Sequence, residues 1–133
     1  MNHEEWEAVT EHSEQAAVIR WARTAALVYP GIDLLHAIPN GTPARSGWRT
    51  GRWMAAEGAR RGVPDLCLPV PLHGKAGLYV EMKSATGRLT EDQRWWHARL
   101  REVGHVVLVC RSATEAIEGI ERYYKGRTEC PNH

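Results

Sequence analysis

The sequence predicts an α/β fold in which helices flank a small mixed β-sheet. Residues 78–83 alternate between apolar and polar, with Leu78, Val80 and Met82 on one face, which is typical of a half-buried strand. Residues 105–110 form an unbroken apolar run, which is typical of a central strand covered on both faces. Each of these two strands is followed by a capping box, so we expect a helix after each of them.

The other elements are indicated by helical periodicity and by turn residues. Glu14, Val18, Trp21 and Ala25 recur at helical spacing, and a Pro-Gly pair stops this first helix. Gly62 ends a later, arginine-rich helix in the same way. In chain order we expect a helix (11–28), a strand (32–38), a helix (48–61), two strands (63–68 and 78–83), a helix (90–103), a strand (105–110) and a helix (112–124).

The last two helices each have an apolar stripe that we expect to face the core. The expected inward side chains are Trp96, Leu100 and Val103 in the helix over residues 90–103, and Ile117, Ile120 and Tyr124 in the final helix.

Length and composition indicate one folded domain. The chain has 133 residues, 43% of them hydrophobic and 25% charged, and this length buries a sizeable core without metal or disulfide staples. We expect a single domain over residues 1–133, with a core over about 11–124 and a frayed tail.

The apolar runs are too short to span a membrane, and the acidic N-terminus lacks the apolar core of a signal peptide. Three widely spaced cysteines indicate free thiols in a reducing cytoplasm and no zinc site.

The charge is unevenly distributed, although the net charge is only +1. Residues 1–14 hold five glutamates and no Lys or Arg, whereas residues 45–61 hold five arginines and a single acidic residue. Two tryptophans lie among these arginines, as on surfaces that neutralise phosphates and stack with bases. A solvated helix face with ordinary arginines gives the same pattern. The candidate DNA contacts are Arg45, Arg49, Arg52, Arg60 and Arg61.

Two acidic residues and a lysine interrupt the apolar pattern of the sheet. Glu81 and Lys83 lie two apart on one strand, so their Cα atoms are about 6.6 Å apart and both side chains leave the same face. If Asp65 ends the neighbouring strand on that face, two carboxylates meet beside an amine. Close carboxylates repel unless a proton or a cation intervenes, and oxygen ligands of this kind suit Mg²⁺ or Mn²⁺. The alternative to a metal site is an exposed strand with a Glu–Lys pair on its surface, which contributes little energy.

Three ordered blocks resemble the virus-type replication-repair nuclease (VRR-NUC) family of the PD-(D/E)xK nuclease superfamily. They are residues 62–66 (GVPDL), 78–84 (LYVEMKS) and 90–93 (TEDQ). Upstream, Glu14-Gln15 and residues 38–41 (IPNG) resemble stand-alone phage and bacterial members. The resemblance runs from about residue 11 to residue 124, which is nearly the whole chain.

The resemblance implies a restriction-endonuclease-like fold and a Mg²⁺- or Mn²⁺-dependent phosphodiesterase. Asp65 and Glu81 match the metal ligands, with the backbone carbonyl of Met82 as a third, and Lys83 matches the catalytic lysine. Two further catalytic candidates are also implied. Glu14 matches a helix glutamate that supports the metal, often through water, and Gln93 matches the family glutamine near the site.

Alternatives remain for the additional residues. Glu14 is otherwise a solvated helix residue, and Glu11, one turn earlier, competes for its role. Gln93 is otherwise the third residue of a capping box. Asn40, a candidate DNA contact, also suits a turn with positive φ.

The expected function is that of a divalent-metal-dependent endonuclease acting on branched or structured DNA in replication, repair or recombination. The family resemblance implies an enzyme like a Holliday-junction resolvase that works as a homodimer. We expect it in the cytoplasm of a bacterial or phage-infected cell, with no membrane partner. The alternatives are a flap- or nick-directed nuclease and a non-catalytic DNA-binding module.

Overall fold

The computed structural model describes residues 2–39 and 56–127, and within these ranges it forms the α/β architecture predicted above. None of the helices in these ranges is long and apolar enough to cross a bilayer. In chain order the elements are α1 (His3–Thr24), the 3-10 helix η1 (Ile32–Leu34), β1 (His36–Ala37), β2 (Leu66–Leu68), β3 (Leu78–Met82), α3 (Glu91–Glu102), β4 (Val106–Cys110) and α4 (Ala113–Tyr124).

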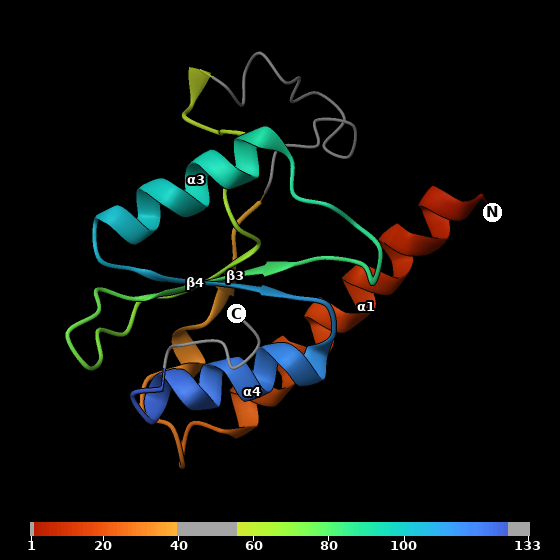
Figure 1. Cartoon of the computed structure of the whole chain (residues 1–133). Coiled ribbons are helices and arrows are strands. Elements are labelled where there is room, and N and C mark those ends of the chain that lie inside the picture. The colour runs from red at the N-terminus through yellow and green to blue at the C-terminus, as the bar shows by residue number, and fades with distance from the viewer. Residues whose placement is uncertain (1, 40–55, 128–133) are drawn as a thin grey trace.

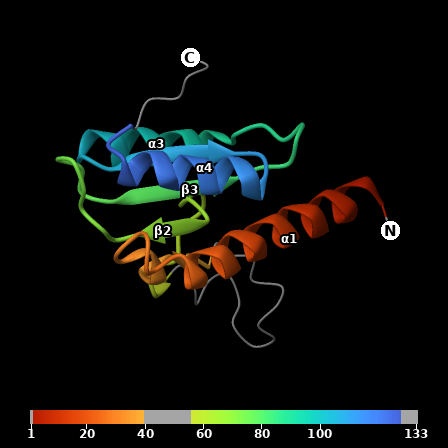
Figure 2. The ribbon, with the colours of Figure 1, turned by 90° about the horizontal axis from the view of Figure 1, so that it is seen from below.

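The strands form one mixed sheet in the order β1-β2-β3-β4. β1 and β3 are both antiparallel to β2, whereas β4 is parallel to β3. Figure 1 shows α3 on one face of this sheet and α1 and α4 on the other, and Figure 2 shows the N-terminal part of α1 extending away from the sheet. The two faces of the sheet therefore have different coverings, and this difference determines where polar side chains can be accommodated.

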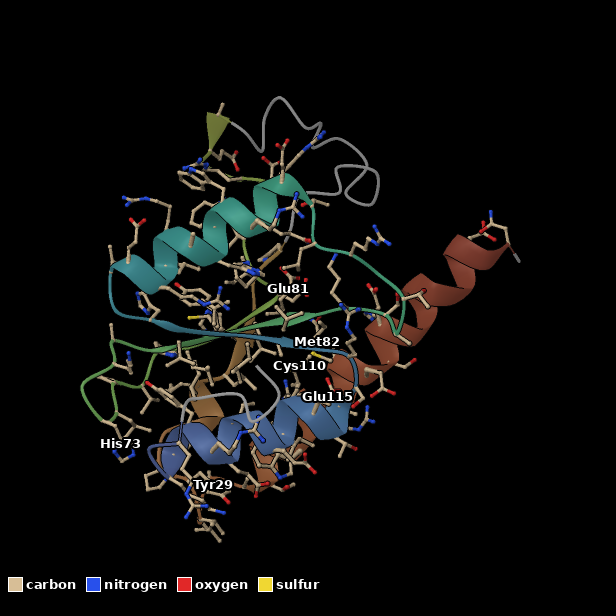
Figure 3. The ribbon with its side chains drawn as sticks, viewed as in Figure 1. Tyr29, His73, Glu81, Met82, Cys110 and Glu115 are labelled. Carbon is tan, nitrogen blue, oxygen red and sulfur yellow. The ribbon has the colours of Figure 1, made fainter. Side chains whose placement is uncertain are left out.

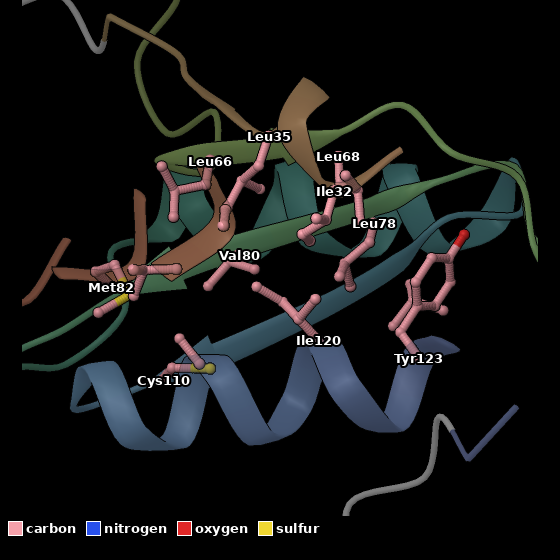
Figure 4. Packing of buried hydrophobic residues seen from close by; sticks show 14 of the residues in the cluster. Ile32, Leu35, Leu66, Leu68, Leu78, Val80, Met82, Cys110, Ile120 and Tyr123 are labelled. Carbon is pink, nitrogen blue, oxygen red and sulfur yellow. The ribbon is translucent and has the colours of Figure 1, made fainter. Parts of the chain in front are cut away.

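The main hydrophobic core lies between the sheet and the pair α1 and α4 (Figure 4). Leu66, Leu78 and Val80 point into it from the strands, because alternate residues of a strand share a face. Ile120 and Tyr123 fill it from α4, and the Tyr123 hydroxyl donates a hydrogen bond of 2.6 Å to the carbonyl of Val70. The opposite sheet face, under α3, is therefore left to the side chains between these core residues.

The structure corrects the predicted N-terminal elements. The first helix begins earlier than expected, at His3 with a capping box from Asn2, and ends at Thr24, so that Leu27 is 99% exposed. The expected strand over residues 32–38 is mostly the 3-10 helix η1, followed by the two-residue strand β1. The reason is a left-handed turn at Gly31, with φ 89°, which directs the chain into a helical turn.

The predicted helix over residues 48–61 lies largely outside the described residues, but its end is corrected. Ala56 is helical, whereas residues 57 and 58 form a turn and residues 59 and 60 have no regular structure, so the helix ends before Glu57 and not near Gly62. Gly62 has φ 90° and is buried beneath α3, where an added Cβ would come within 2.5 Å of the Asp92 backbone. This close approach brings the segment before β2 against the first turn of α3. β2 itself begins at Leu66 rather than at residue 63.

The buried faces of the last two helices are also rotated from the prediction. Val103 is 60% exposed, and His97 takes a buried position beside Leu100, because the inner face of α3 is centred about a quarter turn from Val103. In α4 the buried residues are Ala116, Gly119, Ile120 and Tyr123, whereas Ile117 and Tyr124 are half-buried. β4 is covered by helices on both faces, as expected, but it lies at one end of the described sheet and not at its centre.

Candidate active site

Asp65 and Glu81 lie side by side on the face of the sheet that α3 covers. Asp65 directly precedes β2, and because Leu66 pairs with Val80, the antiparallel register brings Asp65 next to Glu81. The two side chains share a hydrogen bond. Figure 3 shows Glu81 pointing from β3 toward α3, while Met82, the next residue, points to the opposite side. The structure therefore brings together the two carboxylates proposed from the sequence, on one face.

The Asp65 carboxylate is fixed by the backbone of β3. Its Oδ2 accepts a hydrogen bond of 2.7 Å from the amide of Met82, whose own side chain is buried in the main core. The next amide, that of Lys83, donates to the carbonyl of Cys110 in β4 at 2.9 Å. The backbone around the acidic pair is therefore held from both neighbouring strands, which limits how far either carboxylate can move.

Burial makes two negative charges unfavourable at this pair. Burial, followed by the hydrogen bond and the charge of Glu81, raises the pKa of Asp65 to about 8, against the lowering effects of the Met82 amide and Lys83. Burial also raises the pKa of Glu81, which is 1% exposed, although the hydrogen bond from Asp65 and the charge of Lys83 act in the opposite direction. Without a cation, the pair therefore retains a proton near neutral pH.

Lys83 follows β3 directly, and its charge acts on both carboxylates. The turn after it is held by Arg111, whose Nη1 donates to the carbonyls of Ser84 at 2.6 Å and Gly87 at 2.7 Å. An added Cβ at Gly87 would lie 2.9 Å from Oγ of Ser84 and 3.5 Å from Cδ of Lys83. The lysine therefore leaves the sheet beside a tight, well-anchored turn.

The glutamates of α1 reach two different places. Oε1 of Glu11 accepts a hydrogen bond of 2.7 Å from the amide of Ser84, and the charge of Glu11 raises the pKa of Glu81. The carboxylate of Glu14 instead accepts from the amide of Ala113, the first residue of α4. Between the two candidates that the sequence left open, Glu11 is the one beside the acidic pair, whereas Glu14 caps a helix.

Gln93 takes part in the capping box at the start of α3. Its Oε1 accepts from the amide of Thr90 at 2.9 Å, and its own amide donates to the Thr90 hydroxyl at 3.1 Å. The side-chain oxygen of Gln93 is thus engaged at the helix terminus, as expected for the third residue of a capping box.

His97 contacts the acidic pair but was not among the sequence candidates. It lies one turn after Gln93 and is 2% exposed, and its Nε2 lies 3.2 Å from Oε1 of Glu81. Burial, and then the charges of Arg101 and Lys83, lower the pKa of His97 to about 4, so the ring is neutral. The available signal was a polar residue three positions before Leu100, on the inner face of the helix.

Of the five candidate arginines, two lie within the described residues. Arg60 and Arg61 are both exposed, and the Arg60 guanidinium lies 5.3 Å from the ring centre of Trp95 and 4.9 Å from that of Trp96. Trp95 is 49% exposed, so this cation–π cluster forms part of the surface beside the first half of α3. The remaining candidates for DNA contact, Asn40, Arg45, Arg49 and Arg52, lie outside the described residues.

The donor set suits a hard divalent cation more than zinc. Within the described ranges, no group of three or more His, Cys, Asp or Glu side chains is arranged to hold a metal, and neither Cys67 nor Cys110 is in a disulfide. Two carboxylates that share a proton fit a cation with oxygen ligands, which commonly keeps waters and binds substrate phosphate. Asp65, Glu81 and the Met82 carbonyl are the groups that would hold Mg²⁺ or Mn²⁺ here.

Comparison with known proteins agrees with the architecture. The family model of the VRR-NUC domain matches residues 9–114. A solved structure described as a "VRR_NUC domain protein" superposes with a TM-score of 0.73 at 23% sequence identity, covering 87% of this chain and 88% of that chain. No curated protein matches the sequence. At this identity, the superposition shows a shared fold.

Proposed function

Because the chain belongs to the VRR-NUC domain family, a family of nucleases, we propose that it is a divalent-metal-dependent endonuclease of branched or structured DNA. In this proposal it hydrolyses phosphodiester bonds with Mg²⁺ or Mn²⁺, in the manner of a Holliday-junction resolvase, and serves replication, repair or recombination. The observation that carries the proposal is the acidic pair, Asp65 and Glu81. The two carboxylates lie on one face of the sheet, and the positive charge of Lys83 acts on both.

The chemistry divides among the residues of the pair and their neighbours. Asp65 and Glu81, with the Met82 carbonyl, would hold the cation, which would supply the charge that activates the attacking water and offsets the charge building on the phosphate. Lys83 would orient that water or stabilise the developing negative charge, and to accept the proton of the water it would first have to lose its own. Glu11 adds a third negative charge close to Glu81 and strengthens the preference of the site for a cation.

The DNA-facing surface in this proposal includes the Arg60–Trp95–Trp96 cluster. Exposed arginine neutralises phosphate, and an exposed indole ring offers a stacking platform. The segment before β2 joins this cluster to Asp65, because Gly62 packs against the first turn of α3. Substrate bound along this surface would therefore be guided toward the acidic pair.

A homodimer completes the proposal. Among the described residues each protomer contributes one such acidic pair, Asp65 and Glu81, whereas symmetric cleavage of a four-way junction needs two sites related by a twofold axis. Light scattering at micromolar concentration tests this point, and a protein that stays monomeric with and without junction DNA contradicts it.

The deciding experiment compares labelled four-way junction, flap, nicked and linear duplex DNA, with Mg²⁺, with Mn²⁺ and with EDTA. We expect cleavage only with a cation, fastest on the branched substrates, and its loss in Asp65→Asn and Glu81→Gln proteins that remain folded by circular dichroism. Cleavage in excess EDTA, or by either variant at the parental rate, rules the proposal out. Binding without cleavage under every cation would favour a DNA-binding module, although carboxylates facing the phosphates do not suit such a role.

A further inference from the structure

His97 connects α3 to the acidic pair through one hydrogen bond. The ring is buried between the helix and the sheet, with Nε2 3.2 Å from Oε1 of Glu81. α3 lies on the face toward which Glu81 points (Figure 3). A buried carboxylate requires hydrogen-bond donors, and this helix supplies one from its second turn. Gln93, one turn earlier, has its side-chain oxygen engaged with Thr90 in the helix cap.

The two ring nitrogens show which one carries the proton. Nδ1 of His97 is buried and has no hydrogen-bond partner among the described residues. A neutral imidazole has one N–H donor and one acceptor nitrogen, and an ionised carboxylate only accepts. Buried N–H groups without an acceptor are rare in proteins. The arrangement therefore assigns the proton to Nε2, where it points at Glu81, and leaves Nδ1 as a bare acceptor.

From this geometry we propose that His97 is a positioning residue, whose Nε2–H donates to Glu81 and fixes the plane of its carboxylate opposite Asp65. This inference rests on the proposed function, because a fixed carboxylate plane matters when the pair holds a cation. Glutamate has a long and flexible side chain, so its orientation must be set by its neighbours. Groups that hydrogen-bond to metal ligands orient those ligands, and their removal commonly weakens metal binding.

Three variants of His97 separate hydrogen bonding from packing. His97→Gln places an amide N–H about where Nε2 lies, so the hydrogen bond to Glu81 is kept. His97→Asn is equally polar, but its amide ends near the position of Nδ1 and falls short of Glu81. His97→Leu fills the space with an apolar side chain and has no donor. The Gln and Asn variants form a matched pair that differs mainly in reach.

The primary readout is Mn²⁺ affinity of the full chain by calorimetry, with thermal unfolding in EDTA as the control for folding. We expect His97→Leu and His97→Asn to weaken Mn²⁺ binding by about 10-fold to 100-fold, and His97→Gln to recover most of that loss. A long-range ¹H–¹⁵N spectrum of the metal-free parental protein should show His97 protonated at Nε2. Cleavage of junction DNA should follow the same order as the metal affinity.

The outcomes are distinct. Parental affinity in all three variants, or equal losses in the Gln and Asn variants, overturns the role of His97 and leaves the nuclease proposal standing. If His97→Leu fails to fold, the Gln and Asn pair still decides the question. Protonation at Nδ1 in the spectrum also overturns the assignment. If the parental chain neither binds Mn²⁺ nor cuts DNA, the proposed function fails together with this inference, and that failure is seen in the parental protein rather than in the variants.

Discussion

Oδ2 of Asp65 accepts the amide hydrogen of Met82 at 2.7 Å, so the carboxylate before β2 is anchored to the backbone of β3. The same side chain shares a hydrogen bond with Glu81, the residue that directly precedes Met82. One acidic residue is thus held by the strand that carries the other. Because the polypeptide already holds both carboxylates together, the cation of the proposed function would replace the shared proton without a large rearrangement of the backbone.

The first prediction separates the role of Lys83 from the role of the acidic pair. Lys83→Met should lower the rate of DNA cleavage by about 10²-fold to 10³-fold, as expected for the loss of a positive group that stabilises the developing negative charge. It should leave Mn²⁺ affinity close to parental or slightly stronger, since the lysine charge opposes a nearby cation. Asp65→Asn should lose both cleavage and Mn²⁺ binding. Calorimetry and a junction-cleavage assay on the same preparations measure both quantities, and loss of Mn²⁺ binding in Lys83→Met contradicts this division of roles.

The second prediction compares two glutamates one turn apart on α1. Glu11→Gln should reduce Mn²⁺ affinity and cleavage, because it removes a negative charge that acts on Glu81, while its amide oxygen still accepts from Ser84. Glu14→Gln should leave metal affinity unchanged. It should lower the free energy of unfolding by about 0.3–1 kcal/mol, since a carboxylate at the N-terminus of α4 interacts favourably with the helix dipole.

Both variants make the same chemical change, so each serves as the control for the other. Urea unfolding and metal titration of the two proteins give the comparison. If Glu14→Gln loses metal affinity while Glu11→Gln keeps it, the helix glutamate of the site is Glu14 after all.

The sequence predicted the acidic pair and the lysine because those positions depend on local rules. Alternation along residues 78–83 places Glu81 and Lys83 on the face opposite the core residues. Because β2 is antiparallel to β3 and Leu66 pairs with Val80, Asp65 lies on the same face as Glu81. The helical spacing of Val18, Trp21 and Ala25 and the capping box at Thr90 likewise predicted helices that the structure contains.

The remaining features depend on how the elements pack, which periodicity does not determine. Glu11 and Glu14 lie on the same side of α1, and only the docking of that helix decides which one reaches the site. His97 was missed because the buried face of α3 is rotated from the apolar stripe that includes Val103. The spacing of His97 from Leu100 is a signal only once the buried face of α3 is known, and a single sequence does not determine that face.

The third prediction concerns the stability of the metal-free protein. Burial and Glu81 raise the pKa of Asp65 to about 8 from an ordinary value of 3.8. Between these values the folded protein binds more protons than the unfolded chain, so stability falls as the pH rises. His97 acts oppositely at lower pH, because burial lowers its pKa to about 4 from 6.5 and makes stability rise with pH over that interval. The decline should therefore be clearest between about pH 6.5 and 8.

Thermal unfolding in EDTA across this window tests the sign. Asp65→Asn removes the titrating group and should flatten the dependence. A parental protein that becomes more stable toward pH 8 contradicts the raised pKa of the acidic pair.

The fourth prediction follows from the proton held by the acidic pair. Binding of Mn²⁺ near pH 7 should release about one proton, because the ligands must be deprotonated to coordinate the cation. The affinity should therefore rise with pH up to about pH 8 and level off above it. Calorimetry in two buffers with different ionisation enthalpies gives the number of protons released. Binding that releases none across this interval means that the pair is already ionised in the absence of metal.

The fifth prediction tests the Arg60–Trp95–Trp96 cluster as a DNA contact. Arg60→Gln should weaken DNA binding and reduce the slope of log affinity against log salt by about 0.9 for duplex DNA, since one phosphate contact is lost. Trp95→Ala should weaken binding by about 1–3 kcal/mol if the exposed ring stacks on an unpaired base at a branch, with little change on uninterrupted duplex.

Arg99→Gln is the matched control, because Arg99 lies toward the other end of α3 and pairs with Glu102. Fluorescence anisotropy at several salt concentrations, in Ca²⁺ to prevent cleavage, measures the three variants and the parental protein. Equal slopes for Arg60→Gln, Arg99→Gln and the parental chain would place the DNA on another face, because a guanidinium that neutralises a phosphate cannot be removed without changing the number of counterions released.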